Sequence, residues 1–102
     1  MSKPPTPQTV SRLLAKAGFE KAETHRGITS EGFHVIRYRL QAGVVIVNWQ
    51  AGSGAGFNWA QHDATLGSYA DTLTEAGYSA YIRNEMGRPD HVIVTVRKES
   101  HA

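Results

Sequence analysis

The sequence predicts an α+β fold, a two-layer sandwich in which two helices cover one face of a mostly antiparallel five-stranded sheet. One indication is a pair of amphipathic segments that each end at a glycine. Another is a set of short segments rich in β-branched and aromatic residues, separated by short turns. Because short connections favour antiparallel neighbours, we expect the order α-β-β-β-α-β-β. At 102 residues and without cysteine, the chain is expected to form one core that needs no disulfides.

The first helix is predicted to begin at Thr6-Pro7, with threonine as the N-cap and proline at the first helical position. Its apolar stripe has helical spacing and consists of Val10, Leu13, Leu14 and Ala17. Gly18 ends it, because glycine adopts the left-handed conformation at little cost. Residues 1–7, with three prolines, are predicted to be a disordered lead-in, residues 8–98 a single domain and residues 99–102 a tail.

The first half is expected to contain three strands. Residues 19–23 form a short first strand, 24–32 a polar loop, 33–40 a second strand and 44–49 a third that completes a hairpin. Strand residues alternate between two faces. In the second strand the face predicted to be buried carries His34, Ile36, Tyr38 and Leu40.

A second helix is predicted to begin at Asn58 or Asp63 and to end at Gly77. Strands follow at 78–84 and 91–98, joined by a turn at 85–90. The segment before this helix is predicted to be a flexible loop with glycine at every second position, namely Gly52, Gly54 and Gly56. Its spacing matches neither the P-loop nor the dinucleotide-binding motif.

One pattern occurs twice. Leu14-Ala15-Lys16-Ala17-Gly18-Phe19 returns as Leu73-Thr74-Glu75-Ala76-Gly77-Tyr78, and each copy is followed by His-Val-Ile, at 34–36 and at 91–93. This indicates an internal pseudo-repeat within one domain. The alternative is that the chain uses the common helix–glycine–strand device twice, independently.

Charge is unevenly distributed. Residues 1–40 carry seven Lys/Arg and three acids (net +4), residues 41–82 no bases and three acids (net −3), and residues 83–102 four bases and three acids (net +1). A basic region of this kind indicates contact with nucleic acid or an acidic protein surface, with solvated surface charge as the alternative. The candidate binding residues are Arg12, Lys16, Lys21, Arg26, Arg37 and Arg39.

Few residues indicate chemistry. Histidine acts as an acid or base near neutral pH, so His34 is the catalytic candidate. No histidine pair has zinc-helix spacing and no acids form a recognisable catalytic pair, so we predict no metal and no cofactor. No apolar run reaches signal-peptide or membrane-span length, which predicts a cytoplasmic protein without membrane contact.

Residues from about Thr9 to Ala76 resemble the HicA-type toxins. The likeness lies in Leu13–Phe19, a polar loop, and Gly32-Phe33-His34-Val35 followed by a hairpin and a helix. Those toxins are small ribonucleases on an α-β-β-β-α fold like that of double-stranded-RNA-binding domains, with a Gly-Ser/Thr-His segment that carries the catalytic histidine. The resemblance implies that His34 is a general acid/base. Phe33 replaces the hydroxyl residue, and the hairpin at 78–98 extends beyond the family fold.

Three functions follow as hypotheses. The first is a small non-catalytic module that binds nucleic acid or an acidic protein through the basic N-terminal half. The second is a HicA-like ribonuclease that uses His34. The third is a protein-binding adaptor or inhibitor, such as phages and mobile elements encode, with a sheet face or edge that could form a homodimer. Double-stranded-RNA binders place lysines at the start of the second helix. Residues 58–66 contain no Lys or Arg, which argues against that mode.

Overall fold

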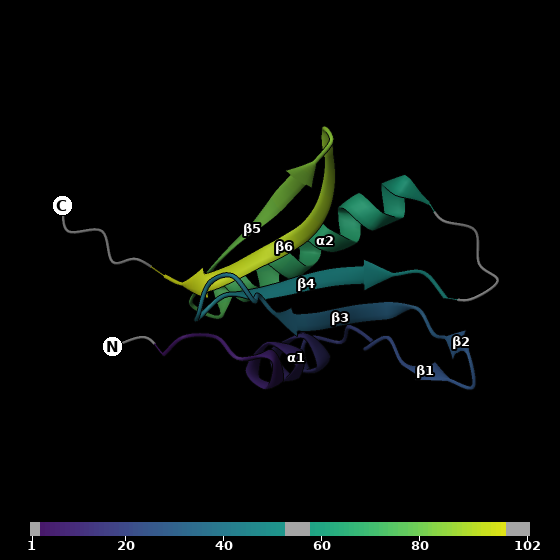
Figure 1. Ribbon diagram of the computed structural model, residues 1–102, viewed down its shortest axis with the longest axis horizontal. Helices are drawn as coiled ribbons and strands as arrows, with labels where there is room; N and C mark the ends of the chain where they lie inside the picture. The colour runs from purple at the N-terminus through teal and green to yellow at the C-terminus, as the bar shows by residue number, and fades with distance from the viewer. Residues whose placement is uncertain (1–2, 53–57, 98–102) are drawn as a thin grey trace.

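The computed structural model describes residues 3–52 and 58–97 (Figure 1). Its elements in chain order are α1 (Pro7–Lys16), β1 (Thr24–His25), β2 (Ile28–Thr29), β3 (Gly32–Arg37), β4 (Val45–Gln50), α2 (Trp59–Glu75), β5 (Tyr78–Glu85) and β6 (Arg88–Val96). The α+β class is as predicted. Parts of the predictions lie outside the described residues: the first residues of the lead-in, the loop glycines Gly54 and Gly56, Lys98 at the end of the last predicted strand and of the domain, and the tail at 99–102.

The main sheet has four antiparallel strands in the order β3-β4-β6-β5, so the prediction of five strands is wrong. The segment predicted as the first strand, 19–23, touches β3 only through one isolated bridge between Lys21 and Phe33. There the Phe33 N–H donates to the Glu20 carbonyl and the Ala22 N–H donates to the Phe33 carbonyl, both at 2.9 Å. The chain then leaves the sheet edge to form a separate hairpin, β1–β2, within the predicted loop.

The helix ends follow the local signals. The Thr9 N–H donates to the Thr6 hydroxyl (3.2 Å) at the start of α1. The Gln61 N–H donates to the Asn58 side-chain oxygen (3.1 Å) at the start of α2, so the alternative start at Asp63 is wrong. Gly18 and Gly77 have φ of 101° and 104°, the left-handed conformation that ends each helix as predicted.

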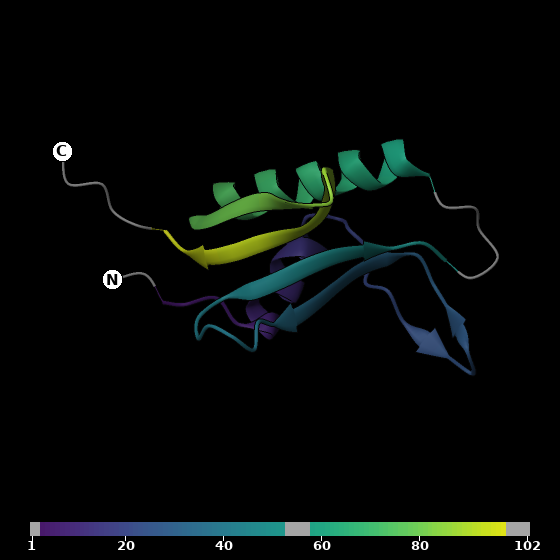
Figure 2. The ribbon, with the colours of Figure 1, turned by 45° about the horizontal axis from the view of Figure 1, so that its top comes forward.

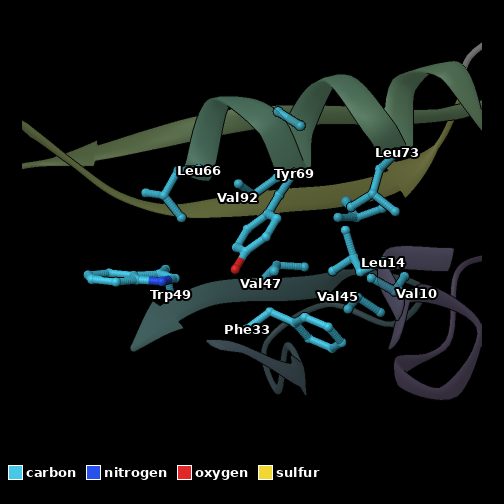
Figure 3. Packing of buried hydrophobic residues seen from close by; sticks show 12 residues of the cluster. Val10, Leu14, Phe33, Val45, Val47, Trp49, Leu66, Tyr69, Leu73 and Val92 are labelled. Carbon is cyan, nitrogen blue, oxygen red and sulfur yellow. The ribbon is translucent and has the colours of Figure 1, made fainter. Parts of the chain in front are cut away.

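Both helices pack on the same face of the sheet, and the core lies between them and the strands (Figures 2 and 3). α1 lies against β3, and α2 lies against β4, β5 and β6. The largest fully buried side chain is Tyr69 of α2, whose ring meets those of Phe19 and Phe33 edge-on at 4.9 and 6.2 Å between centroids. Among the described residues, no helix lies on the other face of the sheet, which is called the open face below.

The predicted burial of β3 is reversed. Phe33 is completely buried and Val35 packs against the core, whereas His34, Ile36 and Leu40 are exposed. Tyr38 is half-buried on a small cluster of Val44, Ile46 and Ile93 on the open face. The position of Phe33 decides the face, because its ring fills the space beneath Tyr69 and alternation then turns His34 outward.

The two His-Val-Ile tripeptides lie on either side of β4. Val35 and Val92 both pair with Val47. One residue further along, Ile36 and Ile93 both pair with Ile46. The elements that carry the tripeptides differ, since β3 is the first strand of the pair β3–β4 whereas β6 is the second strand of the pair β5–β6. The shared tripeptide therefore corresponds to a shared environment beside β4, with valine toward the helices and isoleucine on the open face.

Candidate nucleic-acid interface

The structure brings the six predicted binding residues to the β3 side of the molecule. All six side chains are exposed. Arg12 and Lys16 are on α1, Lys21 follows that helix and Arg26 is at the tip of the β1–β2 hairpin, while Arg37 ends β3 and Arg39 lies in the connection to β4. α1, the hairpin and β3 lie beside one another along this side (Figure 1). This set is called the basic edge: Arg12, Lys16, Lys21, Arg26, Arg37 and Arg39.

The cations of the basic edge have no carboxylate partner within the described residues. The ion pairs of the described residues lie outside this set: they are Arg83 with Glu85, His62 with Asp63, and His91 with Asp90. An exposed cation without a partner loses no ion pair when it meets an external anion. The basic edge is therefore available to a negatively charged ligand.

The helix layer has opposite charges at its two sides. α1 carries Arg12 and Lys16 and no acid, whereas α2 carries Asp63, Asp71 and Glu75 and no base. α1 packs on β3, while α2 packs nearer the opposite edge of the sheet. The β3 side of the helix layer is therefore positive and the α2 side negative.

His34 lies on the open face and is exposed. It shares a shallow hollow with Lys21, Asn48, Trp49 and Gln50, and Asn48 is its direct partner across β3 and β4. An imidazole can transfer protons near neutral pH, and a lysine ammonium beside it can hold a phosphate. These residue types fit acid/base chemistry on a phosphodiester.

Gly32 allows Lys21 to reach this hollow. A Cβ at position 32 would lie under 3.0 Å from backbone atoms of Glu20, Lys21 and Ala22. Only glycine lets that segment lie directly on the start of β3. The Gly32-x-His34 pattern therefore has a structural role: Gly32 lets Lys21 lie close to the start of β3, and His34, two residues later, lies in the same hollow as Lys21.

The tryptophans on either side of the glycine-rich segment both make ring contacts with His62. Trp49 is buried, and its ring lies 6.1 Å from that of His62, which is itself buried. The Trp59 ring lies 5.6 Å from His62 on the other side, and the Arg88 guanidinium lies 3.9 Å from the Trp59 ring centroid. The sequence indicated neither the His62 contacts nor the cation–π contact, because these residues come from β4, α2 and β6.

A second hollow lies on the open face beside β5 and β6, and none of the predicted site residues lines it. Tyr38, Tyr81, Arg83 and Arg97 are among its lining residues. Alternation along β5 was the available signal, since Tyr81 and Arg83 are two residues apart and so share a face. The opposing β3–β4 connection, which supplies Tyr38, could not be located from the sequence.

Two structural findings concern other kinds of site. Within residues 3–52 and 58–97, no three His, Cys, Asp or Glu side chains are grouped so that they could hold a metal ion. Over the same residues, no helix has both the length and the apolar character needed to cross a membrane.

Comparisons with protein-family models, with curated proteins and with solved structures return no match to this chain. The likeness to HicA-type toxins thus depends on the residues quoted for it. Phe33, which stands where that family has a hydroxyl residue, points into the core beneath Tyr69.

Proposed function

We propose that the protein is a non-catalytic nucleic-acid-binding module that contacts phosphates through the basic edge. The observation that supports this is the gathering of six exposed cations from α1, the hairpin and β3 on one side, without carboxylate partners among the described residues. Nucleic acid is preferred to an acidic protein surface because the cations come from α1, the β1–β2 hairpin and β3, which lie along one side (Figure 1), and a nucleic-acid backbone carries charges at regular intervals.

Counterion release sets the expected salt dependence. If all six cations contact phosphates, log K falls against log salt with a slope of about −5 for duplex DNA and about −4 for a single strand. Raising the salt from about 50 to 200 mM then weakens duplex binding by roughly 10³-fold.

The test is a fluorescence anisotropy titration against labelled DNA and RNA at these two salt concentrations. Arg37→Gln and Arg39→Gln should each reduce the magnitude of the slope by about 1. Arg88→Gln is the matched control, because Arg88 contacts Trp59 at the far side of the sheet and its loss should leave the slope unchanged. Absence of binding at low salt to either nucleic acid would refute the proposal. Retained capture of an acidic protein would then favour the adaptor hypothesis.

A second candidate is a ribonuclease that uses His34, and the hollow that this side chain shares with Lys21 and Asn48 favours it. In this proposal His34 transfers the protons and Lys21 holds the phosphate. RNA cleavage, and growth arrest on expression, should be lost in His34→Gln while RNA binding and the unfolding midpoint are kept.

His91→Gln is the control for that experiment, because His91 has the same tripeptide context but lies in β6, outside the hollow that contains His34. Equal cleavage by wild type and His34→Gln would reject the assignment. Cleavage by neither protein, with binding retained, would leave the non-catalytic module as the function.

A further inference from the structure

An apolar row crosses the open face of the sheet. The strand register aligns Ile36 of β3, Ile46 of β4, Ile93 of β6 and Tyr81 of β5. The two central isoleucines are 8% and 5% exposed, whereas Ile36 and Tyr81 at the two edges are 40% and 53% exposed. Tyr81 therefore offers an accessible aromatic ring beside an apolar floor, on a face that neither α1 nor α2 covers (Figure 2).

Beside this row lies a hollow of about 890 Å³, between β5 and β6 and the β3–β4 connection. Ile93 contributes to its floor, and Tyr38 and Tyr81 come from its opposite sides. Hydroxyl groups of Ser79 and Thr95 also line it. The volume is in the range of small-molecule sites, which combine apolar walls with a few polar groups.

The charge of this hollow is entirely positive among its described lining residues, which include Arg83 and Arg97 and no acid. Arg83 makes an ion pair with Glu85 at 3.4 Å, but both side chains are more than half exposed, so the pair contributes little and a phosphate can replace it. In the β5–β6 register the two arginines are six positions apart, about 20 Å between Cα atoms. Aromatic rings thus lie between two cations, which suits bases flanked by their phosphates.

We propose that this hollow binds a short run of single-stranded nucleic acid, with a base stacked on Tyr81 and phosphates at Arg83 and Arg97. This inference rests on the proposed nucleic-acid-binding function and adds the form of the ligand. Stacking on aromatic side chains accepts any base, but the base must be unpaired to reach the ring. Tyr38 lies between Arg37 and Arg39 in the sequence, so the hollow adjoins the basic edge and one strand can contact both.

The experiment compares an oligonucleotide of about 12 nucleotides, single-stranded and as a duplex, by anisotropy at low salt. Tyr81→Thr keeps the strand propensity of the position and removes the ring, and should weaken single-strand binding about 5- to 100-fold. Tyr81→Phe retains the ring and should bind as wild type does. Met86→Ala, at the fully exposed β5–β6 turn, is the control for a change elsewhere on the hairpin. Circular dichroism confirms that each variant is folded.

The outcomes separate the two proposals. Unchanged single-strand affinity in folded Tyr81→Thr, with weakened binding in Arg37→Gln, overturns the hollow as a site and leaves the basic edge in place. Equal affinity of wild type for the duplex and the single strand also overturns it. If a nucleoside monophosphate binds as tightly as the oligonucleotide, the ligand is a free nucleotide and not a strand. If wild type binds no nucleic acid at all, both proposals fail.

Discussion

Replacing Gly32 by alanine should destabilise the protein by about 3–5 kcal/mol. The added Cβ would lie under 3.0 Å from the backbone of Glu20–Ala22, and backbone atoms cannot rotate away as a flexible side chain would. Relief requires the segment to lift from β3, which breaks two hydrogen bonds, Phe33 N–H to Glu20 and Ala22 N–H to Phe33. Each contributes about 1 kcal/mol net, and more when the freed groups stay buried, while overpacking adds about 1–3 kcal/mol.

Gly67→Ala provides the matched control with the opposite sign. Gly67 is inside α2, and a Cβ there would meet nothing within 4 Å. Because alanine stabilises a helix interior relative to glycine, a gain of about 0.5–1 kcal/mol is expected. Urea unfolding followed by circular dichroism measures both changes. A Gly32→Ala protein within about 0.5 kcal/mol of wild type would refute the close approach that positions Lys21 beside His34.

Three further changes test the core and the caps. Burial, with a smaller contribution from Glu31, raises the pKa of Tyr69 from 10.0 to about 12. The neutral Tyr69 hydroxyl stabilises the fold fully below pH 10, and this stabilisation is lost as the pH rises through 12. In urea unfolding, the free energy of unfolding of wild type should therefore fall by about 3 kcal/mol more than that of Tyr69→Phe over this rise in pH. Equal losses in the two proteins would contradict this. Leu14→Ala removes a fully buried side chain and should cost about 2–5 kcal/mol in urea unfolding, against less than 1 kcal/mol for exposed Leu40→Ala. Asn58→Ala removes the α2 cap and should cost about 1 kcal/mol in thermal unfolding. The control is Gln8→Ala, at a solvent-exposed position of α1, which should leave the stability unchanged.

The parts of the fold that local chemistry determines could be predicted from the sequence. Thr6 and Asn58 cap the helices with their own side chains, and Gly18 and Gly77 end them through their own backbone. Each of these residues acts on backbone groups within four positions of itself in the sequence. Both helices and all four long strands were therefore expected close to where they lie.

Tertiary contacts decided the parts that could not be predicted. In β3 the even residues appeared more apolar along the strand, yet the single ring of Phe33 beneath Tyr69 fixed which face is buried. Residues 19–23 have strand-like composition, but they pair with β3 through one isolated bridge before the chain enters the separate β1–β2 hairpin. Sequence spacing contains no information about either partner.

The candidate site shows the same division. The six cations of the basic edge were identifiable as a group because residues 1–40 carry seven Lys/Arg against three acids. Their common side depends on how α1, the β1–β2 hairpin and β3 are arranged (Figure 1). The open-face hollow was not identifiable, because Tyr38 comes from the β3–β4 connection and Tyr81 from β5, 43 residues further along the chain.

The opposite charges of α1 and α2 have a consequence for how fast a partner is found. Two cations on one helix and three acids on the other give the helix layer an electric dipole that a polyanion's field can turn. The protein would then arrive with its β3 side already directed at the partner, which raises the association rate constant more than it slows dissociation. Neutralising Asp71 and Glu75 should therefore lower mainly the association rate constant, although neither side chain belongs to the basic edge.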